Sequence, residues 1–181
     1  LSVVVGNAPE ADTLMVTKGA LDNVLEVCTQ LRRGDQVFAL NDTERAAIVQ
    51  RFADWSEQGF RVLGLASRVL PDQPHYGRSE ERDMIFRGFL LFFDPPEPGV
   101  KDTIATLDKL GVQVKIISGD SHLVARHVGL AVGLPVERII TCAELSTMKD
   151  EALMHRATLT TLFAEVDPNQ KERIIRALQK T

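Results

Sequence analysis

The chain has 181 residues, 44% of them hydrophobic, which is enough for one large domain or two small ones with a real core. Its formal net charge of −4 provides no global positive field that would attract nucleic acid or an anionic membrane surface. The longest strictly apolar run, residues 89–93, is far too short to cross a bilayer.

The first half of the chain predicts a sheet with flanking helices, because short β-branched runs alternate with segments of helical periodicity. In chain order we expect a strand at 3–5, a turn at 6–10, a strand at 14–16, a helix with apolar residues from Leu21 to Cys28, a longer helix capped by Asn41 or Asp42 and ended by Gly59, a strand at 60–69 and a polar loop at 71–77.

The second half predicts strands that alternate with helices. After a strand at 84–93 and a stiff segment with three prolines at 94–99, we expect a helix ended by Gly111, a strand at 112–117, a helix at 123–132, a strand at 138–141, a helix at 149–157, a strand at 161–164 and a helix at 168–180. This alternation is typical of a doubly wound parallel sheet. The predicted fold class is therefore α/β, with one domain at 1–87, a second at 88–181 and a hinge near 94–99.

The cysteines give no sign of a metal site. Cys28 and Cys142 lie far apart, without metal-ligand spacing. This usage favours reduced, structural cysteines in a cytosolic setting, with a disulfide between the two as the alternative.

The turn Ser118-Gly119-Asp120 follows the buried run at 112–117 and precedes a helix. Ligands of open parallel sheets bind outside the carboxyl ends of the strands, so this turn is a candidate phosphate site. Ser118 would donate its hydroxyl, and Gly119 would allow close approach of the backbone. The simpler alternative is that Asp120 or Ser121 caps the helix, which is the commoner arrangement for such a turn taken alone.

Lysine and arginine side chains mark three further positions. Lys171 lies in the first turn of the last helix, where the helix dipole disfavours a cation unless it faces an anion. The carboxyl ends of parallel strands share one edge, so Lys171 and Ser118 are expected at the same edge and suit phosphoryl transfer. Lys18-Gly19 and Arg61 could approach an anionic ligand in the first half. Taken alone, each of these residues could be an ordinary solvated side chain, which is the commoner case for a lone lysine.

Taken together and in order, these segments resemble P-type ATPases. Five motifs carry the resemblance: Thr17-Lys18-Gly19-Ala20 resembles "KGA", Arg61 with Leu63 resembles "RxL", Asp94-Pro95-Pro96 matches "DPP", Ser118-Gly119-Asp120 matches "TGD" with Ser for Thr, and residues 163–171, FAEVDPNQK, resemble "FARxxPxxK". The resemblance covers essentially the whole chain and is strongest to the bacterial magnesium-transporting branch.

The resemblance implies a partial nucleotide-binding domain followed by a partial phosphorylation domain of haloacid-dehalogenase type. It implies that Lys18, Gly19, Arg61 and Leu63 lie near the adenine and phosphates of ATP. It also implies that Ser118 holds the phosphoryl group and that Lys171 neutralises charge. Asp94, Gly119 and Asp120 would lie close to the nucleotide phosphates and Mg²⁺.

The resemblance also implies that parts of the family's machinery fall outside this sequence. The phosphorylated aspartate of "DKTGT", the "GDGxND" acids, the residue that stacks on adenine and the membrane helices are not among the 181 residues. We therefore expect a cytosolic piece of a cation transporter at the cytoplasmic face of the bacterial inner membrane. Its partners would be ATP and the rest of the transporter, and it would be inactive alone. Open strand edges would favour a homodimer.

Two other hypotheses remain at this point. A free-standing phosphatase of haloacid-dehalogenase type would use Asp94 as its nucleophile, although Pro96 then replaces the acid wanted for proton transfer. A nucleotide-independent interaction module is the third hypothesis, and no motif favours it.

Overall fold

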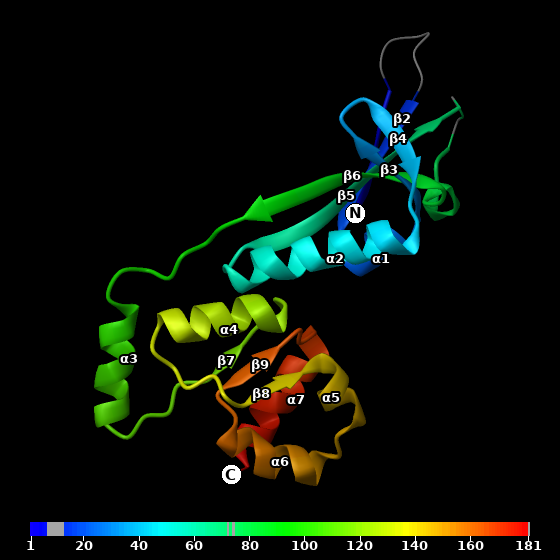
Figure 1. The fold of residues 1–181 in the computed structure, drawn as a ribbon. Coiled ribbons are helices and arrows are strands. Elements are labelled where there is room, and N and C mark those ends of the chain that lie inside the picture. The colour runs from blue at the N-terminus through cyan, green and yellow to red at the C-terminus, as the bar shows by residue number, and fades with distance from the viewer. Residues whose placement is uncertain (7–12, 72, 74, 181) are drawn as a thin grey trace. The chain divides into compact units, whose positions relative to one another are not determined.

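The computed structural model describes residues 1–6, 13–71, 73 and 75–180. Contacts divide the chain into one unit of Leu1–Asp54 with Val62–Phe92 and a second of Trp55–Arg61 with Phe93–Thr181. Each unit has its own sheet (Figure 1). Residues 7–10 of the predicted turn and part of the loop predicted at 71–77 fall outside the described residues.

The first unit is built on a six-stranded mixed sheet. Its strands are β1 (Ser2–Val5), β2 (Thr13–Gly19), β3 (Cys28–Arg33), β4 (Gln36–Ala39), β5 (Arg61–Leu70) and β6 (Met84–Phe92). They lie in the order β1-β2-β5-β6-β3-β4. The pairs β1–β2, β2–β5 and β3–β4 are antiparallel, whereas β3 and β6 are parallel.

Two helices cover one face of this sheet (Figure 1). They are α1 (Leu21–Glu26) and α2 (Asp42–Glu57), and a short 3₁₀ turn, η1 (Arg78–Glu80), precedes β6. The buried cluster joins Leu21, Val24 and Leu25 of α1 and Ile48 of α2 to Met15, Ala66, Met84 and Phe86 of the strands. Burying these side chains supplies the main stabilisation of the unit.

The helical spacing of apolar residues from Leu21 to Cys28 did not predict the hairpin formed by β3 and β4. Cys28 was predicted to end a helix, but it begins β3 and is buried. The helix ends early because the Arg45 guanidinium, from α2, donates to the carbonyl oxygens of Leu25 and Cys28 at 2.9 and 2.8 Å. These bonds satisfy carbonyl groups that a longer helix would otherwise use. Gly34, with a φ of 58°, lies in the hairpin turn between the two strands.

The second unit holds a three-stranded parallel sheet in the order β7-β9-β8 (Figure 1). Its elements are α3 (Val100–Lys109), β7 (Ile116–Ile117), α4 (His122–Ala131), β8 (Ile139–Thr141), α5 (Cys142–Thr147), α6 (Asp150–Leu159), β9 (Leu162–Ala164) and α7 (Pro168–Gln179). The strand predicted at 112–117 is shortened to two residues, because the register pairs only Ile116 and Ile117 with the short β9.

Buried side chains of β8, β9 and the helices form the core of the second unit. Phe163 and Ile140 pack with Leu145, Leu153 and Ile174, all of them almost completely buried. The fold class is thus mixed α/β with sheets and flanking helices. No helix within the described ranges combines the length and apolarity that a membrane crossing requires.

Candidate functional site

The turn at Ser118-Gly119-Asp120 lies at the carboxyl edge of the parallel sheet, against the exit of β9. The Ser118 N–H donates to Phe163 O at 2.9 Å, and the Val166 N–H donates to Ser118 O at 3.0 Å. The Glu165 N–H donates to Asp120 O, also at 2.9 Å. These three bonds fix the turn, because its backbone is paired on both sides of Gly119.

Ser118 and Asp120 are also joined through their side chains. Ser118 Oγ accepts from the Asp120 N–H at 3.1 Å and donates to Asp120 Oδ2 at 2.9 Å. Both side chains are partly exposed, and Gly119 between them is exposed. A Cβ added at Gly119 would lie 3.4 Å from the Val166 carbonyl oxygen, so glycine keeps this approach open. The turn therefore offers an oriented hydroxyl beside a carboxylate.

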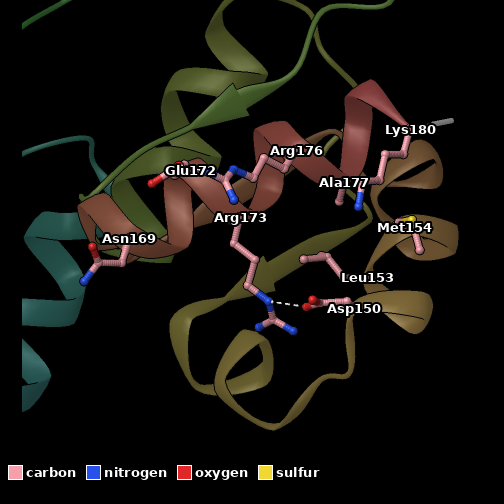
Figure 2. Close-up of a pocket in the computed structure, with 9 residues that line it drawn as sticks. All are labelled: Asp150, Leu153, Met154, Asn169, Glu172, Arg173, Arg176, Ala177 and Lys180. Atoms are coloured by element: carbon pink, nitrogen blue, oxygen red, sulfur yellow. Dashed lines mark hydrogen bonds and ion pairs between the residues drawn. The ribbon is translucent and has the colours of Figure 1, made fainter.

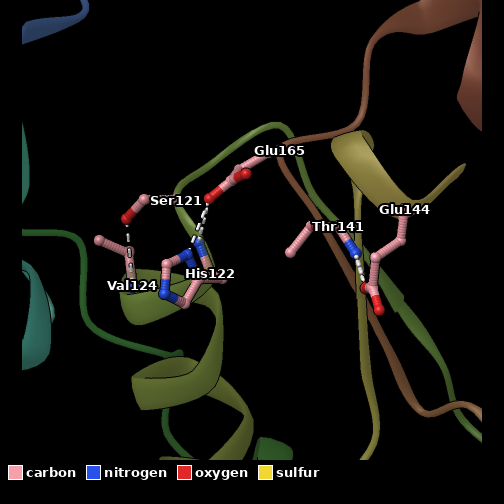
Figure 3. A network of polar contacts seen from close by, with 6 residues as sticks. All are labelled: Ser121, His122, Val124, Thr141, Glu144 and Glu165. Carbon is pink, nitrogen blue, oxygen red and sulfur yellow. Dashed lines mark hydrogen bonds and ion pairs between the residues drawn. The ribbon is translucent and has the colours of Figure 1, made fainter. Parts of the chain in front are cut away.

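Ser121, and not Asp120, is the cap of α4. Its Oγ accepts from the Val124 N–H at 3.4 Å (Figure 3). Helix capping by Ser121 is therefore present together with the exposed turn. The Asp120 carboxylate instead accepts from Ser118 and forms an ion pair with Arg61 at 2.5 Å, which brings these predicted site residues together. A serine cap satisfies one of the four N–H groups that begin a helix without an internal partner.

Glu165 is a residue of this edge that the sequence did not single out. One carboxylate oxygen, Oε1, accepts from the His122 N–H at 3.2 Å and lies 2.8 Å from His122 Nδ1 (Figure 3). Its backbone is left-handed, with a φ of 63°, which is uncommon for a residue other than glycine. One indication of this residue was present in the sequence, because Glu165 occupies the position at which "FARxxPxxK" has arginine.

Lys171 lies in the first turn of α7, as predicted from the sequence. Asp167 caps this helix, with its Oδ1 accepting from the Gln170 N–H at 2.8 Å, and Pro168 occupies the first turn. The Lys171 side chain is exposed, and among the described residues its ammonium group makes no ion pair. Its position follows from β9, which leads directly into α7 at the edge where Ser118 lies.

Lys18 and Gly19 end β2, beside β5. The register pairs Lys18 with Leu65 and Gly19 with Gly64, so the "KGA" segment lies next to the strand that begins with Arg61 and Leu63. Lys18 and Gly19 line a cavity of about 300 Å³ together with polar side chains that include Asn23, Glu26, Arg78 and Glu81. The Lys18 side chain is exposed. The strand pairing thus gathers three motif residues, Lys18, Gly19 and Leu63, in one part of the first unit.

Asp94 lies beyond the end of β6, in an exposed segment with Pro95 and Pro96. β6 belongs to the six-stranded sheet, and its neighbours are β5 and β3. The phosphatase hypothesis needs Asp94 at the end of a strand in the same parallel sheet as Ser118. The strand order does not provide that arrangement.

Another cavity, of about 330 Å³, lies between α6 and α7 and is polar and charged (Figure 2). Arg173 lines it and donates to Asp150 Oδ1 at 2.7 Å and to Leu145 O at 2.8 Å. A further bond goes to the Met148 carbonyl oxygen. These bonds commit Arg173 to joining α7 to the end of α5 and the start of α6, so its role is structural.

A metal site is not complete within the described ranges, where no group of three or more His, Cys, Asp or Glu side chains is arranged to hold an ion. Asp120 is the one acid of the Ser118 turn, and its Oδ2 already accepts from Ser118. A full set of Mg²⁺ ligands would need six oxygen atoms, several of them usually from water and phosphate.

Comparison with known proteins gives one family and a set of relatives. The family described as "P-type ATPase, cytoplasmic domain N" matches residues 2–99. "Magnesium-transporting ATPase, P-type 1" of Salmonella typhimurium is 36% identical over 183 residues, covering 99% of this chain and 20% of that protein. The protein of the same name from Escherichia coli K12 is also 36% identical, over 181 residues, with 99% and 20% covered.

A more distant similarity extends to animal proteins. "Calcium-transporting ATPase type 2C member 1" of Mus musculus is 32% identical over 165 residues, which is 90% of this chain and 17% of that protein. The chain thus spans about a fifth of the length of the relatives it matches.

Proposed function

The chain belongs to the P-type ATPase family, and on that premise we propose that it is a cytosolic part of an ATP-driven, magnesium-transporting ATPase. The first unit would bind the nucleotide. The second would contribute to a phosphorylation domain of haloacid-dehalogenase type with a doubly wound sheet. The sequence predicts domains at 1–87 and 88–181 with a hinge near 94–99, and in the structure β6 continues in the first sheet to Phe92, just before that hinge.

The observation that carries this proposal is the construction of the carboxyl edge of the parallel sheet. Three backbone bonds hold the Ser118 turn against the exit of β9, and β9 leads directly into the helix that presents Lys171. Phosphoryl transfer is catalysed mainly by positioning and by charge stabilisation. A fixed hydroxyl and an exposed ammonium group at one edge of a sheet supply both.

Each proposed residue has a distinct role at this edge. Ser118 would exchange its hydrogen bond to Asp120 Oδ2 for one to a phosphoryl oxygen, which leaves the Asp120 carboxylate close to the nucleotide phosphates. Gly119 would keep the backbone accessible to them. Lys171 would offset the negative charge that the phosphoryl group brings.

Lys18, Gly19 and Leu63 of the first unit, together with Arg61 at the start of β5, would contact ATP, because strand pairing brings "KGA" beside the "RxL" strand. Asp94 would lie near the phosphates in the assembled protein. Mg²⁺ bound to ATP would neutralise phosphate charge when the nucleotide binds.

The proposed setting is the cytoplasmic face of a bacterial inner membrane, within a larger transporter. The edge strands of the six-stranded sheet, β1 and β4, leave backbone groups available for a further strand. A homodimer of the isolated chain would form through such an edge.

Growth of a bacterium that lacks its own magnesium transporters tests the proposal. The full-length protein carrying this chain should restore growth at low Mg²⁺, and Lys171→Ala in that protein should abolish the rescue. Lys180→Ala is the matched control, because it removes the same charge at the opposite end of α7. Failure of the wild type to rescue, with Ca²⁺ accumulation in membrane vesicles, would overturn the assignment to magnesium.

A further inference from the structure

The six-stranded sheet has a second face, which points away from α1 and α2. Side chains alternate between the faces of a strand, so the residues between the buried ones lie on this second face. In β6, Met84 and Phe86 are buried in the core and Arg87 follows Phe86. In β3, Leu31 is buried in the same core and Arg32 follows it. Arg87 and Arg32 therefore lie on the second face.

The register places these two arginines side by side. β3 and β6 are parallel, with Gln30 opposite Ile85 and Leu31 opposite Phe86. The next position of each strand is an arginine, so Arg32 and Arg87 are neighbours across the pair. Like charges at facing positions of neighbouring strands are destabilising. The repulsion between Arg32 and Arg87 destabilises the sheet, although a neutral residue at either position would remove it.

The neighbouring groups do not neutralise the pair. Arg87 Nε donates to Ser67 Oγ of β5 at 2.5 Å, a neutral partner, and no ion pair of Arg87 is present among the described residues. Arg32 Nη2 pairs with Asp35 at 3.0 Å and its Nε donates to the Gly34 carbonyl oxygen at 2.7 Å, but the Asp35 side chain is fully exposed and screens little. Partial burial lowers the pKa of Arg87, and the charge of Arg32 lowers it further.

Valines lie at both ends of the row of residues that contains the pair. Val16 of β2 lies opposite Ser67, and Val37 of β4 lies opposite Arg32, on the same face. Val3 pairs with Val16 at the outer edge and is 51% exposed, and Val37 is 45% exposed. One residue from each strand thus forms a row across the sheet, in the order Val3, Val16, Ser67, Arg87, Arg32 and Val37. Two guanidinium groups and a hydroxyl lie between the valines.

We propose that Arg32 and Arg87 form an oxyanion site on this second face, with Ser67 orienting the Arg87 guanidinium. The ligand is a phosphate or carboxylate group, since the planar guanidinium fork matches both. Bound between the two cations, an oxyanion reduces their repulsion and accepts hydrogen bonds from the guanidinium N–H groups that Gly34, Asp35 and Ser67 do not already use. Lys18 lies on the same face, two residues beyond Val16 along β2 and opposite Leu65.

The test is an NMR titration of the ¹⁵N-labelled chain with inorganic phosphate and, separately, with acetate, at constant ionic strength. We expect saturable shifts of the Arg87 and Arg32 Nε–H signals and of the Ser67 amide. Arg87→Gln should weaken binding by about tenfold or more. Arg87→Lys keeps the charge but loses the planar guanidinium, so its affinity should lie between those of the wild type and Arg87→Gln. The ligand that saturates at the lower concentration identifies the source of the oxyanion, phosphate-bearing or carboxylate-bearing.

Arg126→Gln is the matched control, since it removes one exposed arginine from α4 and should leave the titration unchanged. Arg32→Gln provides a second variant of the site if Arg87→Gln does not fold. Shifts that rise linearly without saturation at every arginine would overturn the proposal. Equal affinity of the wild type and a folded Arg87→Gln or Arg32→Gln variant would overturn it as well.

Discussion

Glu165 holds the first residue of α4 by two contacts to His122, one to the backbone N–H at 3.2 Å and one to the ring Nδ1 at 2.8 Å. The carboxylate acts as an additional cap, since the His122 N–H begins a helix and has no partner inside it. A negative charge at this helix end is also favourable to the helix dipole.

Glu165→Ala should therefore destabilise the chain by about 0.5–2 kcal/mol, the usual range for loss of a helix cap. Glu165→Gln should cost less, because the amide oxygen still accepts from the His122 N–H. Urea unfolding followed by circular dichroism measures both. Equal stability of the wild type and Glu165→Ala would show that the contact contributes nothing.

Gly64→Ala should destabilise the first unit by about 1–3 kcal/mol, the typical cost of overpacking. A Cβ at Gly64 would lie 3.1 Å from Val24 Cβ, so α1 would have to move away from β5. Gly19 lies opposite Gly64 in the sheet, and Gly19→Ala is the matched control. A Cβ at Gly19 would lie 3.7 Å from Val24 Cγ2, an ordinary contact. The midpoint of urea unfolding should fall for Gly64→Ala only, and a similar fall in both variants would contradict this packing argument.

Ser118→Ala should destabilise the second unit by about 1 kcal/mol, because the Asp120 N–H and carboxylate both lose the hydroxyl as a partner. Ser118→Thr retains the hydroxyl and restores the family's "TGD", so it should stay close to the wild type. Thermal unfolding of the three chains makes the comparison. A Thr variant as unstable as the Ala variant would mean that the methyl group, and not the hydroxyl, decides the stability of the turn.

Burial raises the pKa of the Cys28 thiol to about 11, against a smaller opposing effect of the Arg45 charge. Alkylation by iodoacetamide at pH 8 should therefore modify Cys142, which is partly exposed, and leave Cys28 intact in the folded chain. Mass spectrometry of the digested protein reads both sites. Rapid modification of Cys28 without denaturant would contradict its burial.

The same shift predicts a dependence of stability on pH. The unfolded chain loses the Cys28 proton near pH 9, before the folded chain does near pH 11, so stability falls as pH rises through this interval. Cys28→Ala should be less stable at neutral pH but should lose less between pH 9 and 11. Denaturant unfolding at several pH values measures the difference, and parallel curves for the two proteins would refute it.

Much of the architecture could be predicted from the sequence, and the failures have physical causes. The helix at 42–57 and the final helix were predicted because each has a cap and an apolar periodicity. The β3–β4 hairpin was missed because Leu21, Val24, Leu25 and Cys28 share helical spacing, while Arg45, distant in sequence, ends the helix after Glu26. Tertiary contacts overrode the local pattern there.

The same limit applies to the candidate site. Ser118, Gly119 and Lys171 could be proposed because strand ends and helix starts are readable from local residues. Glu165 could not, because its role depends on β7 and β9 being neighbours and on a left-handed backbone at that position. The α5 helix was not predicted, although the sequence carries a local signal for it. That signal is the capping box in which Glu144 accepts from the Thr141 N–H at 3.0 Å (Figure 3).

An NMR titration of the ¹⁵N-labelled chain with Mg²⁺–ATP measures whether the chain binds ATP through Lys18 and its neighbours, as we propose. We predict weak, saturable shifts at Lys18, Gly19 and Leu63, with affinity about tenfold lower in Lys18→Ala and unchanged in the Lys180→Ala control. Equal affinity of the wild type and Lys18→Ala, or shifts that bypass the end of β2, would contradict the account.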